Sequence, residues 1–120
     1  MAFKQHLEAV CSQVEGSVAC SIMGFNGLPV GSHRVSEPDL DLDGLWVEYS
    51  SLLGQIQRAA ESMQGGNVKE VAIHTDKLTT VARLINPEYF LVLALTPEGN
   101  VGKGRFALRI IAPQIAPELS

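Results

Sequence analysis

Three aspartates alternate along one loop of the sequence, at Asp39, Asp41 and Asp43. This spacing matches the first half of a calcium-binding EF-hand loop, in which alternating carboxylates surround a hard cation. Such a loop needs a bidentate glutamate at its twelfth position, which is Ser50 here. Acidic residues just before a helix also cap its N-terminus and interact favourably with its dipole. We therefore predict a helix N-terminus capped by Asp43 rather than a calcium site.

A glycine-rich pattern, GxGxxA, occurs at Gly102, Gly104 and Ala107 after a predicted strand. Such a pattern binds the pyrophosphate of a dinucleotide only inside a strand–helix–strand unit with an acidic residue about 20 positions further on. Only 13 residues follow Ala107, which is too few for another helix and strand. We expect the two glycines to let a helix approach the sheet closely, and we expect no nucleotide cofactor.

The histidines and cysteines are too scattered for a catalytic or metal site. His6, His33 and His74 lie on three different predicted elements, in no spacing typical of metal ligands. Cys11 and Cys20 form no CxxC pair, and no serine lies in a GxSxG elbow. The sequence therefore predicts no metal, no cofactor and no catalytic residues, so we expect the protein not to be an enzyme.

The most informative segment is the long helix predicted over residues 45–64. Its apolar arc is wider than the stripe of about 100° that covers one face of a sheet. One interpretation is a second contact surface on this helix, made by Trp46, Ser50, Leu53, Gly54 and Gln57. In the alternative, Trp46 and Leu53 are peripheral core residues. Because aromatic residues often anchor interfaces, we slightly favour the contact surface.

Hydrophobic periodicity and turn residues predict three helices and five strands. Asn26-Gly27 lies between two extended segments, so we expect a hairpin there with both residues at positive φ. Asp76-Lys77 is a second predicted turn. The predicted elements are helix 3–15, strands 17–25 and 28–34, helix 45–64, strands 68–75, 78–85 and 89–96, and helix 101–112, the last ended by Pro113 and Pro117.

The order of these elements determines the expected fold. Short hairpin turns force antiparallel pairing within each strand group. The first and last strands are apolar on both faces, so we expect both at the centre of the sheet. Pro29 and the pair Lys69-Glu70 indicate edge strands. We therefore expect an α+β fold: a five-stranded antiparallel sheet in the order 2-1-5-4-3, with the long helix on one face and the two terminal helices on the other.

Composition limits the class of protein. A chain of 120 residues with 46% hydrophobic residues and a net charge of -4 is expected to fold as a single domain over residues 1–120. No apolar run approaches the roughly 20 residues that cross a bilayer. The acidic balance argues against nucleic acid or an anionic membrane as partner. Two cysteines without a disulfide framework, and a start that lacks the apolar core of a signal peptide, indicate the cytoplasm.

Four local phrases carry a family resemblance through their sequence and their spacing. They are GFNGLPV at 24–30, GNVKEVAI at 66–73, NPEYFLV at 86–92 and PEGNVGKGR at 97–105. With these phrases the chain resembles the Roadblock / dynein-light-chain family over nearly its whole length. It is most similar to the bacterial stand-alone members that regulate small Ras-like GTPases, and the resemblance implies the fold expected above.

The resemblance implies a non-enzymatic platform that binds a small Ras-like GTPase and modulates its nucleotide cycle. Family members typically form homodimers, with their middle helices side by side and their third strands paired edge to edge. The acidic stretch 37–43 is expected to steer a basic surface of a partner, whereas Arg58 and Arg105 are expected to be solvated. The implied dimer or partner interface comprises Trp46, Tyr49, Ser50, Leu53, Gly54, Gln57, Val71 and Ile73.

Other functions fit the same sequence. The chain ends soon after its last helix, unlike the longer gliding-motility regulators, which favours an adaptor over a full GTPase-activating protein. A scaffold that tethers a motor or signalling complex, independently of nucleotide state, is the main alternative. A small-molecule sensor would need a polar pocket, and the apolar positions Ile22, Leu91 and Leu93 argue against one.

Overall fold

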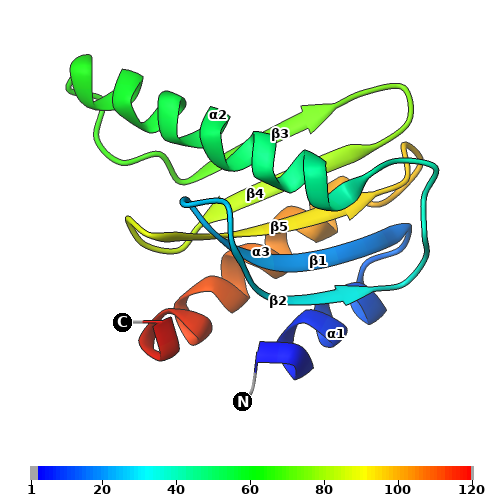
Figure 1. Cartoon of the computed structure of the whole chain (residues 1–120). Coiled ribbons are helices and arrows are strands. Elements are labelled where there is room, and N and C mark those ends of the chain that lie inside the picture. Colours follow the sequence, from blue (N-terminus) through cyan, green and yellow to red (C-terminus); the bar gives the residue numbers. More distant parts are fainter. Residues whose placement is uncertain (1–2, 120) are drawn as a thin grey trace.

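The computed structural model describes residues 3–119, which form three α-helices, five strands and a short 3₁₀ helix (Figure 1). The order of the elements is the one that the sequence predicted. Their bounds are α1 Phe3–Gln13, β1 Ser17–Gly24, β2 Pro29–Arg34, α2 Leu42–Ser62, β3 Glu70–His74, β4 Thr79–Leu84, β5 Tyr89–Leu95, α3 Val101–Ile115 and the 3₁₀ helix η1 Ala116–Leu119.

The five strands form one sheet in the order β2-β1-β5-β4-β3, and every neighbouring pair is antiparallel. The predicted order is therefore confirmed. β1 and β5 lie at the centre, where Ile22 is paired with Leu91, and both of these side chains are fully buried. A strand that is apolar on both faces loses most of its contact with water only at the centre of a covered sheet.

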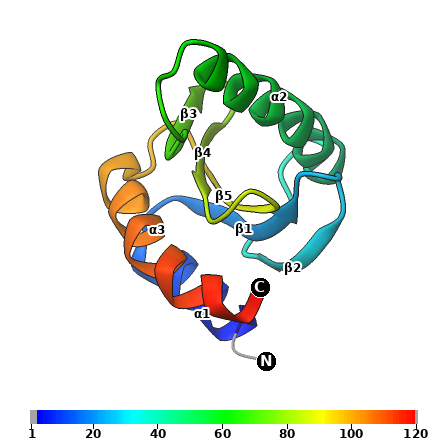
Figure 2. The same ribbon diagram turned by 90° about the vertical axis from the view of Figure 1, so that its left-hand side faces the viewer.

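Helices cover both faces of the sheet (Figure 2). On one face, α2 encloses a cluster that includes Trp46, Leu53 and Phe90. On the other face, α1 and α3 enclose a second cluster around Leu7, Leu93 and other residues. The expected arrangement, one long helix opposite two terminal helices, is confirmed. In the described part of the chain, no helix is both long enough and apolar enough to cross a membrane.

The long helix begins earlier than predicted, at Leu42 rather than Leu45. Its N-cap is Asp41, whose Oδ1 accepts a hydrogen bond from the Gly44 backbone N–H at 3.1 Å. The prediction that Asp43 caps the helix is wrong, because the Asp43 carboxylate instead accepts from the Arg34 guanidinium at 2.6 Å. Leu42 is 1% exposed. Because its side chain is buried in the core, the helix begins three residues earlier than predicted.

The last helix passes through Pro113 to Ile115, so the predicted end at Ala112 is wrong. Proline lacks the backbone N–H and normally ends a helix. Here the loss falls in the final turn, where Ala112 and Ile115 are both buried against the core. The Ala116 N–H still donates to the Ala112 carbonyl. Burial of the last turn therefore compensates for the hydrogen bond that the proline removes.

The first hairpin has a longer connection than predicted. Only Gly27 has positive φ (87°), and Asn26 does not, so the predicted turn geometry is wrong. The Gly27 N–H donates to the Gly24 carbonyl at 3.0 Å, and the Leu28 N–H donates to the Asn26 side chain at 3.0 Å. Asparagine stabilises the turn through its side chain, and the one strained position falls to glycine.

Gly104 lies where α3 approaches the sheet most closely. A Cβ atom at this position would lie 2.9 Å from Cδ2 of the buried Leu93. The expected packing role is therefore confirmed for Gly104. It is wrong for Gly102, which is exposed and has only the Asn100 side chain within contact distance of a Cβ.

Candidate functional site

The inner face of α2 holds residues that the sequence assigned to a contact surface. Trp46 and Leu53 are 2% and 1% exposed and belong to the core between α2 and the sheet. Ser50 is also buried, and its hydroxyl donates to the Val47 carbonyl at 2.6 Å. The half-buried Tyr49 has its ring centroid 6.1 Å from that of Trp46. Within this chain, Trp46 and Leu53 are therefore core residues, which agrees with the alternative interpretation of the sequence.

A neighbouring face of α2 is apolar and partly open to solvent. It consists of Tyr49, Leu52, Ile56 and Met63, which recur at helical spacing and which we call the α2 flank. Leu52 and Met63 are 42% and 81% exposed, and Tyr49 and Ile56 are half-buried against the same core as Trp46. An exposed apolar face of this kind is a candidate contact surface.

The edge strand β3 carries the last two residues of the predicted interface. Val71 and Ile73 are half-buried on alternate positions of the strand, and Val71 packs against the core under α2. β3 is hydrogen-bonded to β4 on one side and has no strand on the other side in the described sheet. The outer edge of β3 can therefore accept another strand.

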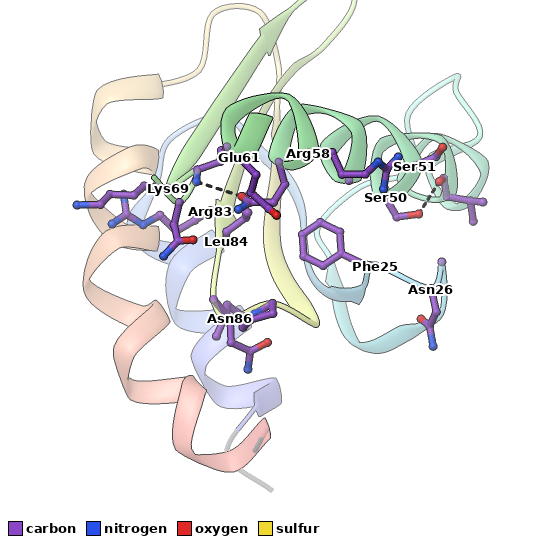
Figure 3. Close-up of a pocket in the computed structure, with 18 residues that line it drawn as sticks. Phe25, Asn26, Ser50, Ser51, Arg58, Glu61, Lys69, Arg83, Leu84 and Asn86 are labelled. Atoms are coloured by element: carbon purple, nitrogen blue, oxygen red, sulfur yellow. Dashed lines mark hydrogen bonds between the residues drawn. The ribbon is translucent and has the colours of Figure 1, made fainter. Parts of the chain in front are cut away.

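Gly54 and Gln57 lie on the side of α2 that faces an open groove of about 1140 Å³. Figure 3 shows this groove between α2, the turn that contains Phe25 and the turn that contains Asn86. A Cβ at Gly54 would contact only Arg58 of the same helix, at 3.6 Å, so no other element approaches it. Gln57 has an internal role, because its Oε1 accepts from the Val68 N–H at 3.0 Å and ties α2 to the segment before β3.

The groove itself is lined by both apolar and charged side chains. Phe25 forms part of its wall and packs against Phe90, with ring centroids 5.0 Å apart and the ring planes tilted by 50°. Arg58, Glu61 and Lys69 project along its rim (Figure 3). A mixed lining in an open groove suits contact with a protein surface rather than enclosure of a small ligand.

Both cysteines and two of the three loop aspartates are engaged in packing, in capping or in an ion pair. Among residues 3–119, no three His, Cys, Asp or Glu side chains are placed to hold one metal ion. Burial raises the pKa of Cys11 to about 11 and that of Cys20 well above its usual value. Neither cysteine is therefore a reactive thiolate at neutral pH. In the acidic loop, Asp41 caps α2 and Asp43 pairs with Arg34. Two of the three alternating aspartates therefore have structural roles that involve no metal ion.

A second groove, which the sequence did not reveal, lies between β3 and α3. At its centre Glu70 accepts a hydrogen bond from Arg105 Nε at 2.6 Å, and its other oxygen lies 3.8 Å from Arg83 Nη1. Arg105 is exposed (56%), as expected for a solvated residue, and it is in addition ion-paired with Glu70. No spacing in the sequence links Glu70 with a residue 35 positions away, so only the packing of α3 against the sheet brings them together.

A search for similar solved structures finds a protein that matches this chain over nearly its whole length. The chain is 51% identical to MglC from Myxococcus xanthus, covering 98% of this chain and 99% of MglC with a TM-score of 0.70. A scan of protein-family models and a search of curated proteins return no match.

Two more distant structures share the fold. A Roadblock/LC7 domain from Streptomyces avermitilis is 16% identical, covers 96% of this chain and 95% of its own, and has a TM-score of 0.83. The gliding protein MglB from Thermus thermophilus is 14% identical, covers 95% of this chain and 85% of its own, and has a TM-score of 0.83. At these identities the likeness concerns the fold, which is that of the Roadblock/LC7 domain.

Proposed function

Because this chain belongs to the Roadblock/LC7 family, with a close relative in MglC, we propose that it is a non-enzymatic, homodimeric regulator or adaptor. In this proposal it binds a small Ras-like GTPase and modulates the nucleotide cycle of that GTPase. The observation that carries the proposal is the α2 flank, an apolar helix face that the described chain leaves partly exposed, above all at Leu52 and Met63.

A twofold dimer accounts for the α2 flank and the β3 edge together. Pairing two α2 flanks buries the same patch on both chains, as a twofold axis requires. Pairing two β3 edges satisfies backbone groups that otherwise invite aggregation. Within the predicted interface, Tyr49, Val71 and Ile73 then make direct contacts, whereas Gly54 lies on the groove side of α2, away from the paired flanks. Trp46 and Leu53 contribute indirectly, because they hold α2 on the sheet.

The GTPase contact requires no catalytic group from this chain. A dimer presents two neighbouring α2 helices as a platform, and such a platform reorients the switch loops of a GTPase through its contacts alone. The acidic loop adds a means of recognition, since Asp39 is exposed and forms no ion pair within the described residues. Its charge raises the rate of encounter with a basic surface.

The dimer is tested by light scattering coupled to size exclusion over a range of concentrations. We expect a mass of twice 12.9 kDa for the natural chain. Leu52→Asp is expected to give the monomer mass, because it puts a charge into the paired α2 flanks. Val35→Asp is the matched control, since Val35 is an exposed apolar residue (56%) beyond the opposite edge strand β2. A monomer for the natural chain contradicts the dimer, and equal masses for the two variants contradict pairing through the α2 flank.

The partner is tested by titrating small Ras-like GTPases of the same organism, loaded with GDP or with a non-hydrolysable GTP analogue. We expect one nucleotide state to bind more tightly, and we expect Leu52→Asp to weaken that binding. Equal affinity for both states contradicts nucleotide-cycle modulation and favours a scaffold. Absence of binding to any of these GTPases contradicts the regulatory function altogether.

A further inference from the structure

The groove between β3 and α3, which we call the α3 groove, is lined mainly by basic residues. It has a volume of about 690 Å³ and opens to solvent. One wall of the groove is α3, which lies on the side of the sheet opposite α2 (Figure 2). Its lining residues are Val68, Lys69, Glu70, Arg83, Gly102, Arg105, Phe106 and Arg109.

The charge of the α3 groove is opposite to that of the whole molecule. Four of its lining residues are cationic and one is acidic, which leaves a local charge of +3 on a chain whose net charge is -4. The single carboxylate, Glu70, is already engaged by Arg83 and Arg105. Lys69 and Arg109 form no ion pair within residues 3–119. The groove therefore has unused positive charge on α3, at Arg109, and directly before β3, at Lys69.

An exposed aromatic ring accompanies this charge. Phe106 is 54% exposed, and the Arg109 guanidinium lies 5.4 Å from the centroid of its ring. One turn further along α3, Ile110 is 48% exposed. An arginine stacked on an aromatic ring presents charge and apolar surface at the same place, which is typical of interface anchors.

The β3 side of the α3 groove is also open. Glu70, Ala72 and His74 alternate with the residues that face α2, and Ala72 and His74 are exposed. α3 packs on β4 and β5 rather than beneath β3. An extended segment therefore has room to lie between the edge strand and the helix.

Charge complementarity identifies the kind of occupant. We propose that the α3 groove binds an acidic segment of a partner protein, with carboxylates on Lys69, Arg105 and Arg109 and an apolar side chain on Phe106. Arginine and lysine pair strongly with carboxylates, and Phe106 offers the apolar contact that a bare polyanion cannot use. This contact lies on the opposite layer from the α2 flank and goes beyond the proposed function.

The acidic loop of a second copy is a poorer occupant. Glu37 and Asp43 both pair with Arg34 of their own chain, and Asp41 caps α2. Only Asp39 remains unengaged among the four acidic residues of the stretch 37–43. An anionic membrane is disfavoured as well, because its broad charged surface extends beyond the groove and is repelled by the net negative charge of the rest of the molecule.

The proposal is tested by fluorescence polarisation with the full chain and a labelled glutamate-rich peptide that contains one central leucine. We expect saturable binding that weakens at least about tenfold between 0.05 and 0.3 M salt, since the contacts are ionic and exposed. Arg109→Glu is expected to weaken binding at least about tenfold and Phe106→Ala several-fold. Both residues are exposed and lie outside the Glu70 ion pairs, so both variants are expected to fold, as circular dichroism will verify.

Arg58→Glu is the matched control, because it makes the same charge change at an exposed arginine on α2. We expect it to leave peptide affinity within about twofold. Equal losses in Arg58→Glu and Arg109→Glu would overturn the proposal, since they would indicate a general effect of net charge. Failure of the peptide to bind, together with Arg109-dependent binding to phosphatidylserine vesicles, would also overturn it in favour of a membrane contact. Neither outcome bears on dimer formation through the α2 flank.

Discussion

Leu53→Ala is expected to lower the free energy of unfolding by about 3 kcal/mol, whereas Leu52→Ala is expected to lower it by about 1 kcal/mol or less. Leu53 is 1% exposed and lies between α2 and the sheet, but Leu52 is 42% exposed on the α2 flank. Truncation removes three carbon atoms, each worth about 0.8 kcal/mol when buried. The cavity left at Leu53 adds to this loss. Both variants change helix propensity equally.

The assay is urea unfolding followed by helical circular dichroism, at a protein concentration where light scattering shows a single oligomeric state for both variants. For a chain of this size, a loss of about 3 kcal/mol lowers the melting temperature by roughly 10 °C. The association constant is measured in parallel. We expect Leu52→Ala to weaken self-association more than Leu53→Ala, because only Leu52 offers its side chain to a partner.

The reasoning would be refuted by similar unfolding free energies for Leu53→Ala and the natural chain, accompanied by loss of the dimer. That result would mean that Leu53 contacts the partner, in agreement with the interpretation that assigned it to a contact surface. An equal destabilisation by both variants would show instead that the α2 flank is already buried within the chain.

Three further predictions follow from individual contacts. Asp41→Ala is expected to lower the free energy of unfolding in urea by about 1 kcal/mol, because it removes the N-cap of α2. Asp43→Ala is expected to lower it by less than about 0.5 kcal/mol, because the ion pair of Asp43 is exposed. Burial raises the Cys11 pKa from 9.0 in the unfolded chain to about 11. Because the unfolded chain loses this proton at lower pH than the folded chain, the free energy of unfolding is expected to fall as pH rises from 9 towards 11. Cys11→Ala is expected to flatten that decline in urea midpoints. Glu70→Gln is expected to cost about 1 kcal/mol, with a smaller difference at high salt, since it leaves Arg83 without its carboxylate.

Local patterns were enough to predict most of the architecture. The alternation and turn residues around β3 and β4, and the apolar runs of β1 and β5, determined which strands lie at the edge and which at the centre. Errors occurred at element ends, where a few buried side chains outweigh local signals. Leu42 extends α2 at its start, and Ile115 carries α3 past Pro113.

The candidate surfaces were only partly accessible to sequence reasoning. Periodicity showed that α2 has an apolar arc too wide for one sheet, but it did not show which part of the arc faces the sheet. That direction depends on how the helix docks, and Trp46 and Leu53 fit the space above β1 and β5 whereas Leu52 and Met63 do not.

The sequence by itself determined the order of elements, the strand order and the existence of a surplus apolar surface on α2. These follow from contacts between neighbours in the chain and from whether each face needs to be buried. Only the tertiary structure decided that Leu52 rather than Leu53 is exposed, and that Glu70 and Arg105 meet beside Phe106 and Arg109. Both results depend on the packing of helices against a sheet, which brings together side chains whose separation along the chain contains no signal of their proximity.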